Sequence, residues 1–297
     1  MSKKSLSTKS INALVEEVLA IESEQAQDAG KLGFMCRAMV QASLPSRKTE
    51  GSEFTRQNGN FTLTMLAPSS IGLPYGTVPR LLLTWLATEA VKTRERELVL
   101  GDTLSSFMRE LGMTPTGGRW GSIPRLKDQS RRLFAATITG FYEDDERTAM
   151  LSQQIADHAN LWWDNGSPDQ AGLWKSTVKL SESFFNEVIN NPVPVDLRAV
   201  KVLQRSPLAL DIYAWLTYRL SYLRSQTLIP WPVLEMQFGA NYKLTRQFKA
   251  AFIEHLATVL TVYPNARVEA TEKGLKLMPS PPHIAKQTSN ANILTGR

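Results

Sequence analysis

Apolar residues recur every three to four positions in several stretches of the chain, and this spacing predicts amphipathic helices. The expected helices span residues 11–19, 33–42, 78–91, 104–111, 123–134, 206–223, 231–238 and 244–260. Alternating or short apolar runs predict strands within residues 60–66, 96–100, 135–142, 148–163, 227–230 and 261–279. Residues 176–189 are expected to form a strand that runs into a short helix. The polar stretch 44–60 is expected to be a loop, and "PVPVD" (192–196) is expected to interrupt regular structure.

The elements follow the same order on both sides of the linker signal "DNGSPDQAG", residues 164–172. Each half runs from a long helix to a short strand, a short helix ending at glycine, a basic helix and a strand pair. This is the order of a helix-turn-helix with a wing. The sequence therefore predicts an α+β fold with two tandem winged-helix domains, at 61–168 and 169–279. Residues 1–60 are expected to form a helical N-terminal arm, and residues 280–297 a disordered, flexible tail.

Composition narrows the class of protein. The 297 residues carry 34 Lys and Arg against 28 Asp and Glu, a net charge of +6, and such an excess attracts polyanions only where it is clustered. Cys36 is the single cysteine, which excludes an intrachain disulfide and a cysteine-based metal site. No apolar run approaches the roughly 18 residues of a membrane span, and no signal-peptide core is present. We therefore expect a cytoplasmic protein without a membrane partner.

The basic helix of the first half lies in "PTGGRWGSIPRLKDQSRRLF", residues 115–134. Ser122 is expected to cap this helix and Pro124 suits its first turn. Apolar residues fall on one narrow arc, so the other side can present guanidinium groups to phosphates and base edges. The expected DNA-binding residues here are Arg119, Arg125, Lys127, Gln129, Arg131 and Arg132. The bland alternative is a solvated basic helix after a flexible loop, while the glycines match no ATP or NAD fingerprint.

The second candidate helix lies in "YKLTRQFKAAFIEHLATVL", residues 242–260. Its polar face is small at Ala250, so the helix can sit deep in a major groove. The expected DNA-binding residues are Lys243, Arg246, Gln247, Lys249 and Ala250, with Arg267, Lys273 and Lys276 of the closing hairpin reaching flanking phosphates. Taken alone, a long two-faced helix is more often core packing with a solvated face. Its equivalence to the first basic helix favours DNA binding.

Catalytic signals are sparse. His158, His255 and His283 are widely separated and none has a second metal ligand at close spacing. The carboxylates of "YEDDER" (142–147) fit a solvated hairpin turn better than a magnesium site, and the Trp162–Trp163 pair and Trp231 fit core packing better than base stacking. We expect no catalytic residue, no metal and no cofactor, and hence no enzyme.

The stretches "GLPYGTVPRLLLTWLATEAV", "ELVLGDTLSSFMRELG" and "PTGGRWGSIPRLKDQSRRLF" resemble the RepA-type plasmid replication initiators, over residues 57–134 and more weakly to about 278. The resemblance implies a plasmid-encoded protein of the bacterial cytoplasm with two winged-helix domains. Such a protein binds double-stranded direct repeats at its origin, helps to open the adjacent AT-rich duplex and recruits the host initiator and replicative helicase. Many members form a homodimer through the first domain.

Two other readings stay open. A dimeric winged-helix transcriptional repressor would share the DNA-binding surface but have no initiator activity. An enzyme such as a nickase or primase would show divalent-metal-dependent cleavage or primer synthesis, and we expect neither.

Overall fold

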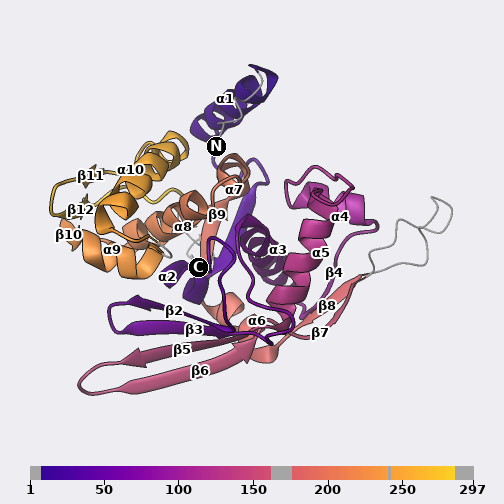
Figure 1. Ribbon diagram of the computed structural model, residues 1–297. Coiled ribbons are helices and arrows are strands. Elements are labelled where there is room, and N and C mark those ends of the chain that lie inside the picture. Colours follow the sequence, from indigo (N-terminus) through magenta and orange to yellow (C-terminus); the bar gives the residue numbers. More distant parts are fainter. Residues whose placement is uncertain (1–7, 162–175, 240–241, 285–297) are drawn as a thin grey trace, which may run out of the picture.

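The computed structural model describes residues 8–161, 176–239 and 242–284. Helices and strands are mixed along the whole of these ranges, so the fold is α+β. Figure 1 shows a four-stranded sheet along one edge of the molecule, with helices of the first half above one end and helices of the second half above the other. No helix in the described ranges is long and apolar enough to cross a membrane.

The four-stranded sheet is antiparallel, in the order β2-β3-β5-β6. Its strands are β2 (Glu53–Asn58), β3 (Phe61–Leu66), β5 (Thr137–Glu143) and β6 (Thr148–Gln154). Leu63, Met65 and Ile138 are buried on the face that meets the helices. Thr55 and Thr64 lie exposed as directly opposed residues of β2 and β3 and share a hydrogen bond of 3.1 Å. One face of the sheet is therefore apolar and packs on the core, and the other face is polar and faces solvent, as is common in antiparallel sheets.

The first half is built around α3 (Thr77–Thr93), whose residues Leu82, Leu86 and Ala90 are buried along one stripe. The chain continues through β4 (Glu97–Val99) and α4 (Leu104–Glu110) to α5 (Ser122–Ala135), which leads directly into the β5–β6 hairpin. Thr103 caps α4, because its hydroxyl accepts the backbone N–H of Ser106. The predicted order of long helix, strand, short helix, basic helix and hairpin is confirmed.

The pairing of β4 is not local. β4 pairs with β8 (Thr177–Leu180), which also pairs with β7 (Ala156–Asn160), so the three-stranded sheet has the order β4-β8-β7. β8 leads into α6 (Glu182–Asn190), which Ser181 caps through the N–H of Phe184. A strand from beyond residue 175 thus completes a sheet of the first half. The predicted linker at 164–172 lies outside the described residues.

The second half repeats the element order with local pairing. It comprises α8 (Pro207–Tyr222), β10 (Thr227–Pro230), α9 (Trp231–Phe238), α10 (Thr245–Val262), β11 (Val268–Ala270) and β12 (Gly274–Leu277). The three strands form one antiparallel sheet in the order β10-β12-β11, so the closing hairpin pairs with the short strand before α9. Tyr213, Phe248 and Phe252 are fully buried between the helices. As predicted, a two-strand hairpin follows the long α10.

The N-terminal residues are built into the fold. α1 (Thr8–Ser23) packs against α7 (Leu197–Leu203), and β1 (Leu32–Cys36) pairs with β9 (Pro192–Asp196). The short α2 (Arg37–Gln41) follows β1. Arg198 donates hydrogen bonds to the carbonyls of Ala20 and Glu24, both at 2.8 Å, and pairs with Asp196 at 2.7 Å. Because four carbonyls at a helix end lack internal partners, the Arg198 guanidinium stabilises the end of α1.

Arg80 joins the two halves. Its guanidinium lies on α3 and donates two hydrogen bonds of 2.7 Å to the carboxylate of Asp211 on α8. The remaining N–H groups donate to the carbonyls of Leu44, Pro45 and Gly76. All five donors are used, which is how a buried arginine is normally satisfied. A second contact between the two halves is made by α9, which packs against β2.

Three sequence predictions about secondary structure are wrong. Residues 33–42 form most of β1 and the short α2 rather than one helix, and residues 53–58, predicted as loop, form β2. β2 lies at a sheet edge, and Phe54 is its one apolar residue and its one buried residue. Its sequence therefore shows no alternation of apolar and polar residues. "PVPVD" forms β9. Proline cannot donate a backbone hydrogen bond, and it is tolerated here because β9 pairs with one strand only, on one of its two edges. β1 and β2 therefore belong to sheets of the fold, and residues 32–58 form no separate arm.

Residues 280–284, predicted as part of a flexible tail, belong to the fold. Tyr263 donates a hydrogen bond of 2.7 Å to the carbonyl of Pro281, and the hydroxyl of Tyr213 lies 2.8 Å from Nδ1 of His283. The His283 ring also lies 4.7 Å, centroid to centroid, from the Tyr263 ring, and Ile284 is buried. Residues 280–284 are therefore packed on the second half, and residues 285–297 lie outside the described residues.

Candidate nucleic-acid interface

The start of α5 is set by a closed loop rather than by a helix cap. Ser122 was expected to be the N-cap, but Gly121 occupies that place and Ser122 is buried inside the first turn. The Ser122 hydroxyl donates to the carbonyl of Thr114 at 2.6 Å and accepts the N–H of Thr116 at 2.9 Å. The Ile123 N–H donates to the carbonyl of Thr116. The loop before α5 is thus bound to the helix by its own hydrogen bonds.

Four of the six predicted cations and amides of this stretch face solvent. Leu126 and Leu133 bury one side of α5, and the exposed residues are Arg119, Arg125, Lys127 and Arg131. Lys127 and Arg131 are one helical turn apart and lie on the same side, whereas Arg125 points about a third of a turn from Arg131 and almost half a turn from Lys127. The exposed face is cationic, with Asp128 as its one half-exposed carboxylate.

Gln129 and Arg132 do not belong to this exposed face. Gln129 is 2% exposed, and its side-chain oxygen accepts the N–H of Tyr75 at 2.8 Å. Arg132 pairs with Asp128 at 2.8 Å, donates to the carbonyl of Leu73 and lies over the Tyr75 ring. The expectation that both face DNA is wrong, because the loop of residues 67–76 covers this side of α5. A helical wheel carries no information about that loop.

α10 presents the polar face that its sequence predicts. Phe248, Phe252, Leu256 and Val259 are buried along the opposite side. The predicted contact residues Lys243, Arg246, Gln247 and Ala250 are all exposed. No acidic residue occupies the first turn of either α5 or α10. The start of α5 therefore keeps the positive end of its helix dipole free of a carboxylate from its own first turn, which suits an approaching phosphate. At the start of α10 the hydroxyl of Thr245 donates a hydrogen bond of 2.6 Å to the carboxylate of Glu235.

The hairpin cations differ in availability. Arg267 and Lys273 are exposed. Lys249 is half-buried, with its ammonium 5.2 Å from the centre of the Trp231 ring and 3.4 Å from the carbonyl of Glu272. Lys276 pairs across the hairpin with Glu269 at 3.4 Å. Lys249 and Lys276 thus hold the hairpin to α10 and to itself, and only Arg267 and Lys273 are free to reach a phosphate.

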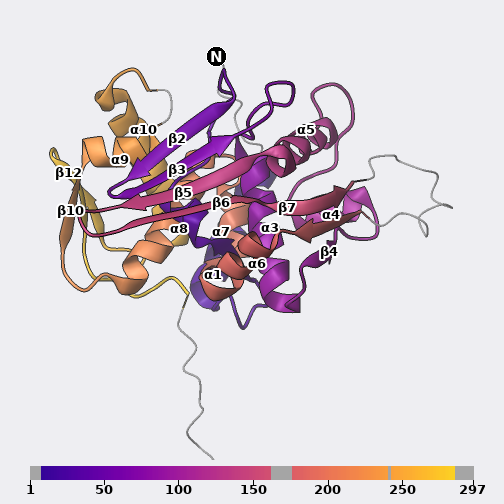
Figure 2. The same ribbon diagram turned by 90° about the horizontal axis from the view of Figure 1, so that it is seen from below.

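Figures 1 and 2 place α10 in the left part of the molecule and α5 to the right of its centre, and in Figure 2 the strands of the β2-β3-β5-β6 sheet run between them. The cationic residues therefore form two separate patches. One consists of Arg119, Arg125, Lys127 and Arg131, and the other of Lys243, Arg246, Arg267 and Lys273.

Comparison with known protein families shows the family of this chain. The family model described as plasmid encoded RepA protein matches residues 73–231, which is more than half of the chain. The chain belongs to the RepA family. The match includes α3, α4 and α5, and ends before α10. No curated protein matches the sequence.

The fold of this RepA-family chain is similar to a solved structure. The crystal structure of domains 2 and 3 of RctB, a selenomethionine derivative, matches with a TM-score of 0.53 at 10% identity, covering 84% of this chain and 99% of that one. A second crystal structure of RctB domains 2–3 has a TM-score of 0.48 at 13% identity, covering 80% of this chain and 94% of that one. The first match supports the arrangement of elements over most of the RepA-family chain.

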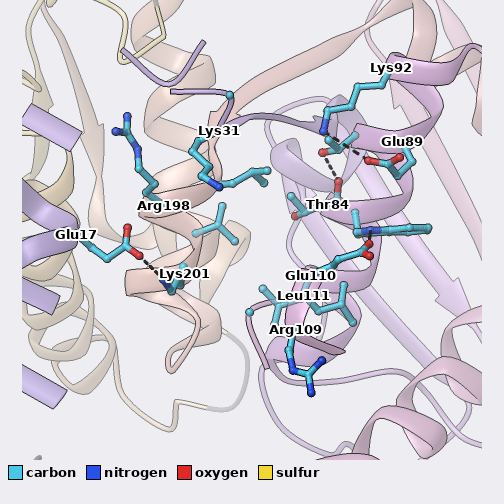
Figure 3. A pocket seen from close by; sticks show the side chains of 17 residues that line it. Glu17, Lys31, Thr84, Glu89, Lys92, Arg109, Glu110, Leu111, Arg198 and Lys201 are labelled. Atoms are coloured by element: carbon cyan, nitrogen blue, oxygen red, sulfur yellow. Dashed lines mark hydrogen bonds and ion pairs between the residues drawn. The ribbon is translucent and has the colours of Figure 1, made fainter. Parts of the chain in front are cut away.

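A concave site of the RepA-family chain lies away from both cationic patches. Figure 3 shows this cavity of about 580 Å³, between α3 and α4 on one side and α1 and α7 on the other. Its carboxylates are already engaged: Glu17 pairs with Lys201, Glu89 with Lys92, and Glu110 accepts the indole N–H of Trp85. These groups bond one another, so the cavity offers no free acid–base pair.

His255 and His283 lie within the fold, whereas His158 is exposed. Burial lowers the pKa of His255, which lies half-buried on α10 with Ser206 within 3.4 Å of its ring, and burial also lowers the pKa of His283. His158 lies exposed on β7. Across the described ranges, no group of three His, Cys, Asp or Glu residues is placed to hold a metal ion. Trp231 is 4% exposed and packs against Phe252, as its core reading predicted.

Proposed function

We propose that this RepA-family chain initiates replication of the plasmid that encodes it by binding repeated double-stranded DNA sites at the origin. In this proposal each half is a winged-helix domain that lays its basic helix in a major groove. The halves are those expected at residues 61–168 and 169–279, except that β2 and β8 lie outside 61–168 and pair with strands of the first half. Support for the initiator role comes from family membership. Support for two DNA-binding modules comes from the repeated order of helix, strand, short helix, basic helix and hairpin.

The observation that carries the proposal is the exposure of cations at equivalent places in both halves. Eight Lys and Arg side chains are exposed on or beside α5 and α10: Arg119, Arg125, Lys127, Arg131, Lys243, Arg246, Arg267 and Lys273. On the second helix, Gln247 and Ala250 lie beside Arg246 and give that face the side chains that read base edges. The proposal requires the two patches to contact different parts of one extended duplex site.

The remaining parts of the proposal come from the family resemblance. Recruitment of the host initiator and replicative helicase, dimerisation through the first domain and residence in the bacterial cytoplasm stay predictions. The proposed activity needs no cofactor and no catalytic chemistry of its own.

A binding titration on origin DNA tests the proposal through its salt dependence. Binding to DNA releases condensed counterions, so added salt weakens it. A protein that contacts about 6–10 phosphates loses affinity by roughly 10³- to 10⁵-fold when the salt concentration rises from 50 to 200 mM. Wild-type protein should show this steep slope on duplex carrying the direct repeats. A flat salt response, or no preference for the repeats over unrelated duplex, would contradict duplex recognition.

Single substitutions assign the roles within α10. Arg246→Ala should weaken binding by about 5- to 150-fold and relax preference at one base pair, whereas Lys273→Ala should weaken all duplexes alike and reduce the salt slope by about one. Arg224→Ala is the matched control, since Arg224 is exposed in the same half but lies in the connection from α8 to β10. Equal affinities of Arg246→Ala and Arg224→Ala proteins would show that α10 is not a recognition helix.

A further inference from the structure

Trp120 is exposed to an unusual degree for a tryptophan. Its relative exposure is 85%, higher than that of any other large apolar residue in the described ranges, with Met150 next at 71%. The other tryptophans of these ranges pack inward: Trp215 and Trp231 are each 4% exposed, and Trp85 contacts Phe107 edge to face. A large aromatic surface in water is unfavourable, so this side chain gains free energy from any ligand that covers it.

The loop that carries Trp120 is closed by its own hydrogen bonds. The Ser122 N–H donates to the Thr116 hydroxyl at 2.9 Å, and the Gly121 N–H donates to the carbonyl of Gly118 at 3.0 Å. Gly118 has a φ of +78°, and a Cβ on Gly121 would collide with the carbonyl oxygens of Thr116 and Gly117. The tight turn therefore requires these glycines. A turn held in this way fixes the backbone at Trp120, which reduces the backbone entropy lost on binding.

The surroundings of Trp120 are cationic. The guanidinium of Arg119 lies 5.3 Å from the centre of the indole ring, and the exposed Arg125 follows in the first turn of α5. A flat aromatic face beside guanidinium groups matches a nucleotide, whose base stacks and whose phosphate is negative. In an intact duplex, neighbouring base pairs already cover both faces of every base. Only an unpaired base offers its face to the indole.

We propose that Trp120 is a stacking site for an unpaired base of single-stranded DNA, with Arg119 holding the adjoining phosphate. This inference deepens the proposed DNA-binding function of α5 and rests on it. One protein would then use the helix face for duplex DNA and the tip of the preceding loop for a strand released from the duplex.

Fluorescence anisotropy on two labelled DNAs tests the site: a 20-nucleotide oligo-dT strand and a duplex that carries the origin repeats. Trp120→Ala removes the stacking face, and Trp120→Phe keeps an aromatic ring. Met150→Ala is the matched control, because it removes an exposed apolar side chain from β6. Thermal unfolding of each variant checks that the fold is retained.

Trp120→Ala should weaken oligo-dT binding by about 5- to 150-fold, the loss of one base–aromatic stack, and change duplex binding by less than about twofold. Trp120→Phe should restore most of the loss, and Met150→Ala should bind both DNAs like wild type. Unchanged oligo-dT affinity in Trp120→Ala overturns the inference, as does an equal loss on both DNAs. Failure of wild type to bind the duplex would instead contradict the proposed function.

Discussion

Replacing Asp211 with Asn tests whether the buried ion pair between α3 and α8 holds the two halves of the chain together. The side chains of Arg80 and Asp211 are 3% and 10% exposed, and two hydrogen bonds of 2.7 Å join them. Arg56 of β2 is a second cation that interacts with this carboxylate, and burial lowers the pKa of Arg56 to about 10. Asp211 is therefore the anion for two largely buried guanidinium groups.

The size of the effect follows from this arrangement. An amide at position 211 keeps one acceptor oxygen but removes the negative charge. Two unit charges about 4 Å apart interact by roughly 4 kcal/mol at an effective dielectric constant of 20. Removing one partner of a buried pair lowers stability by about 3–5 kcal/mol, because the other charge stays buried without compensation. We expect Asp211→Asn to lower the free energy of unfolding by that amount.

Urea unfolding followed by tryptophan fluorescence measures this loss, since Trp215 lies buried on α8 one turn from residue 211. Asp128→Asn is the matched control. Asp128 pairs with Arg132 at 2.8 Å across one turn of α5, but its side chain is 46% exposed. Arg132 is 15% exposed, so this pair is only partly buried, and the control should lose less stability than Asp211→Asn.

An Asp211→Asn protein that loses no more stability than Asp128→Asn would refute the reasoning. The triple variant with Arg56→Met, Arg80→Met and Asp211→Leu separates charge from packing. It removes both buried guanidinium groups together with their carboxylate, so it should be more stable than Asp211→Asn alone.

Two further predictions concern buried titratable groups. Burial lowers the pKa of His283 below its ordinary value near 6.5, so the folded state disfavours its protonation. The free energy of unfolding should be constant above about pH 6.5 and should fall below that pH by at most about 1.4 kcal/mol per pH unit. The urea midpoint of His283→Asn protein should fall less steeply with decreasing pH than that of wild type. Parallel pH profiles of the two proteins would contradict this. Cys36 is 1% exposed, and burial raises the pKa of its thiol to about 12. A thiol reagent should therefore label Cys36 only after the protein unfolds. Fast labelling of the native protein would disprove the burial of this thiol.

The helices that bury one broad face could be predicted from the sequence to within a few residues. α3 was expected at 78–91 and spans 77–93, and α8 was expected at 206–223 and spans 207–222. Their apolar stripes are long, and packing against the core enforces the same period. The exposure of Arg246, Gln247 and Ala250 followed from the same argument, because the side opposite Phe248 and Phe252 can only face outward.

Non-local contacts limited the rest. β2 carries one buried apolar residue and is a strand because β3 pairs with it, and β9 is a strand despite two prolines because β1 does. The wheel of α5 could not show that the loop of residues 67–76 covers Gln129 and Arg132. Nor could the pattern show that Trp120 is exposed, although a tryptophan between glycines and arginine in a turn was a usable signal.

The position of β8 has a consequence for any attempt to isolate the first half. A fragment of residues 61–168 would lack β8, which lies between β4 and β7, and β2, which borders β3. Three strands would then carry open backbone donors and acceptors that recruit neighbouring molecules. Such a fragment should precipitate or self-associate in solution, and any dimer it formed would reflect a cut edge rather than the biology of the intact chain.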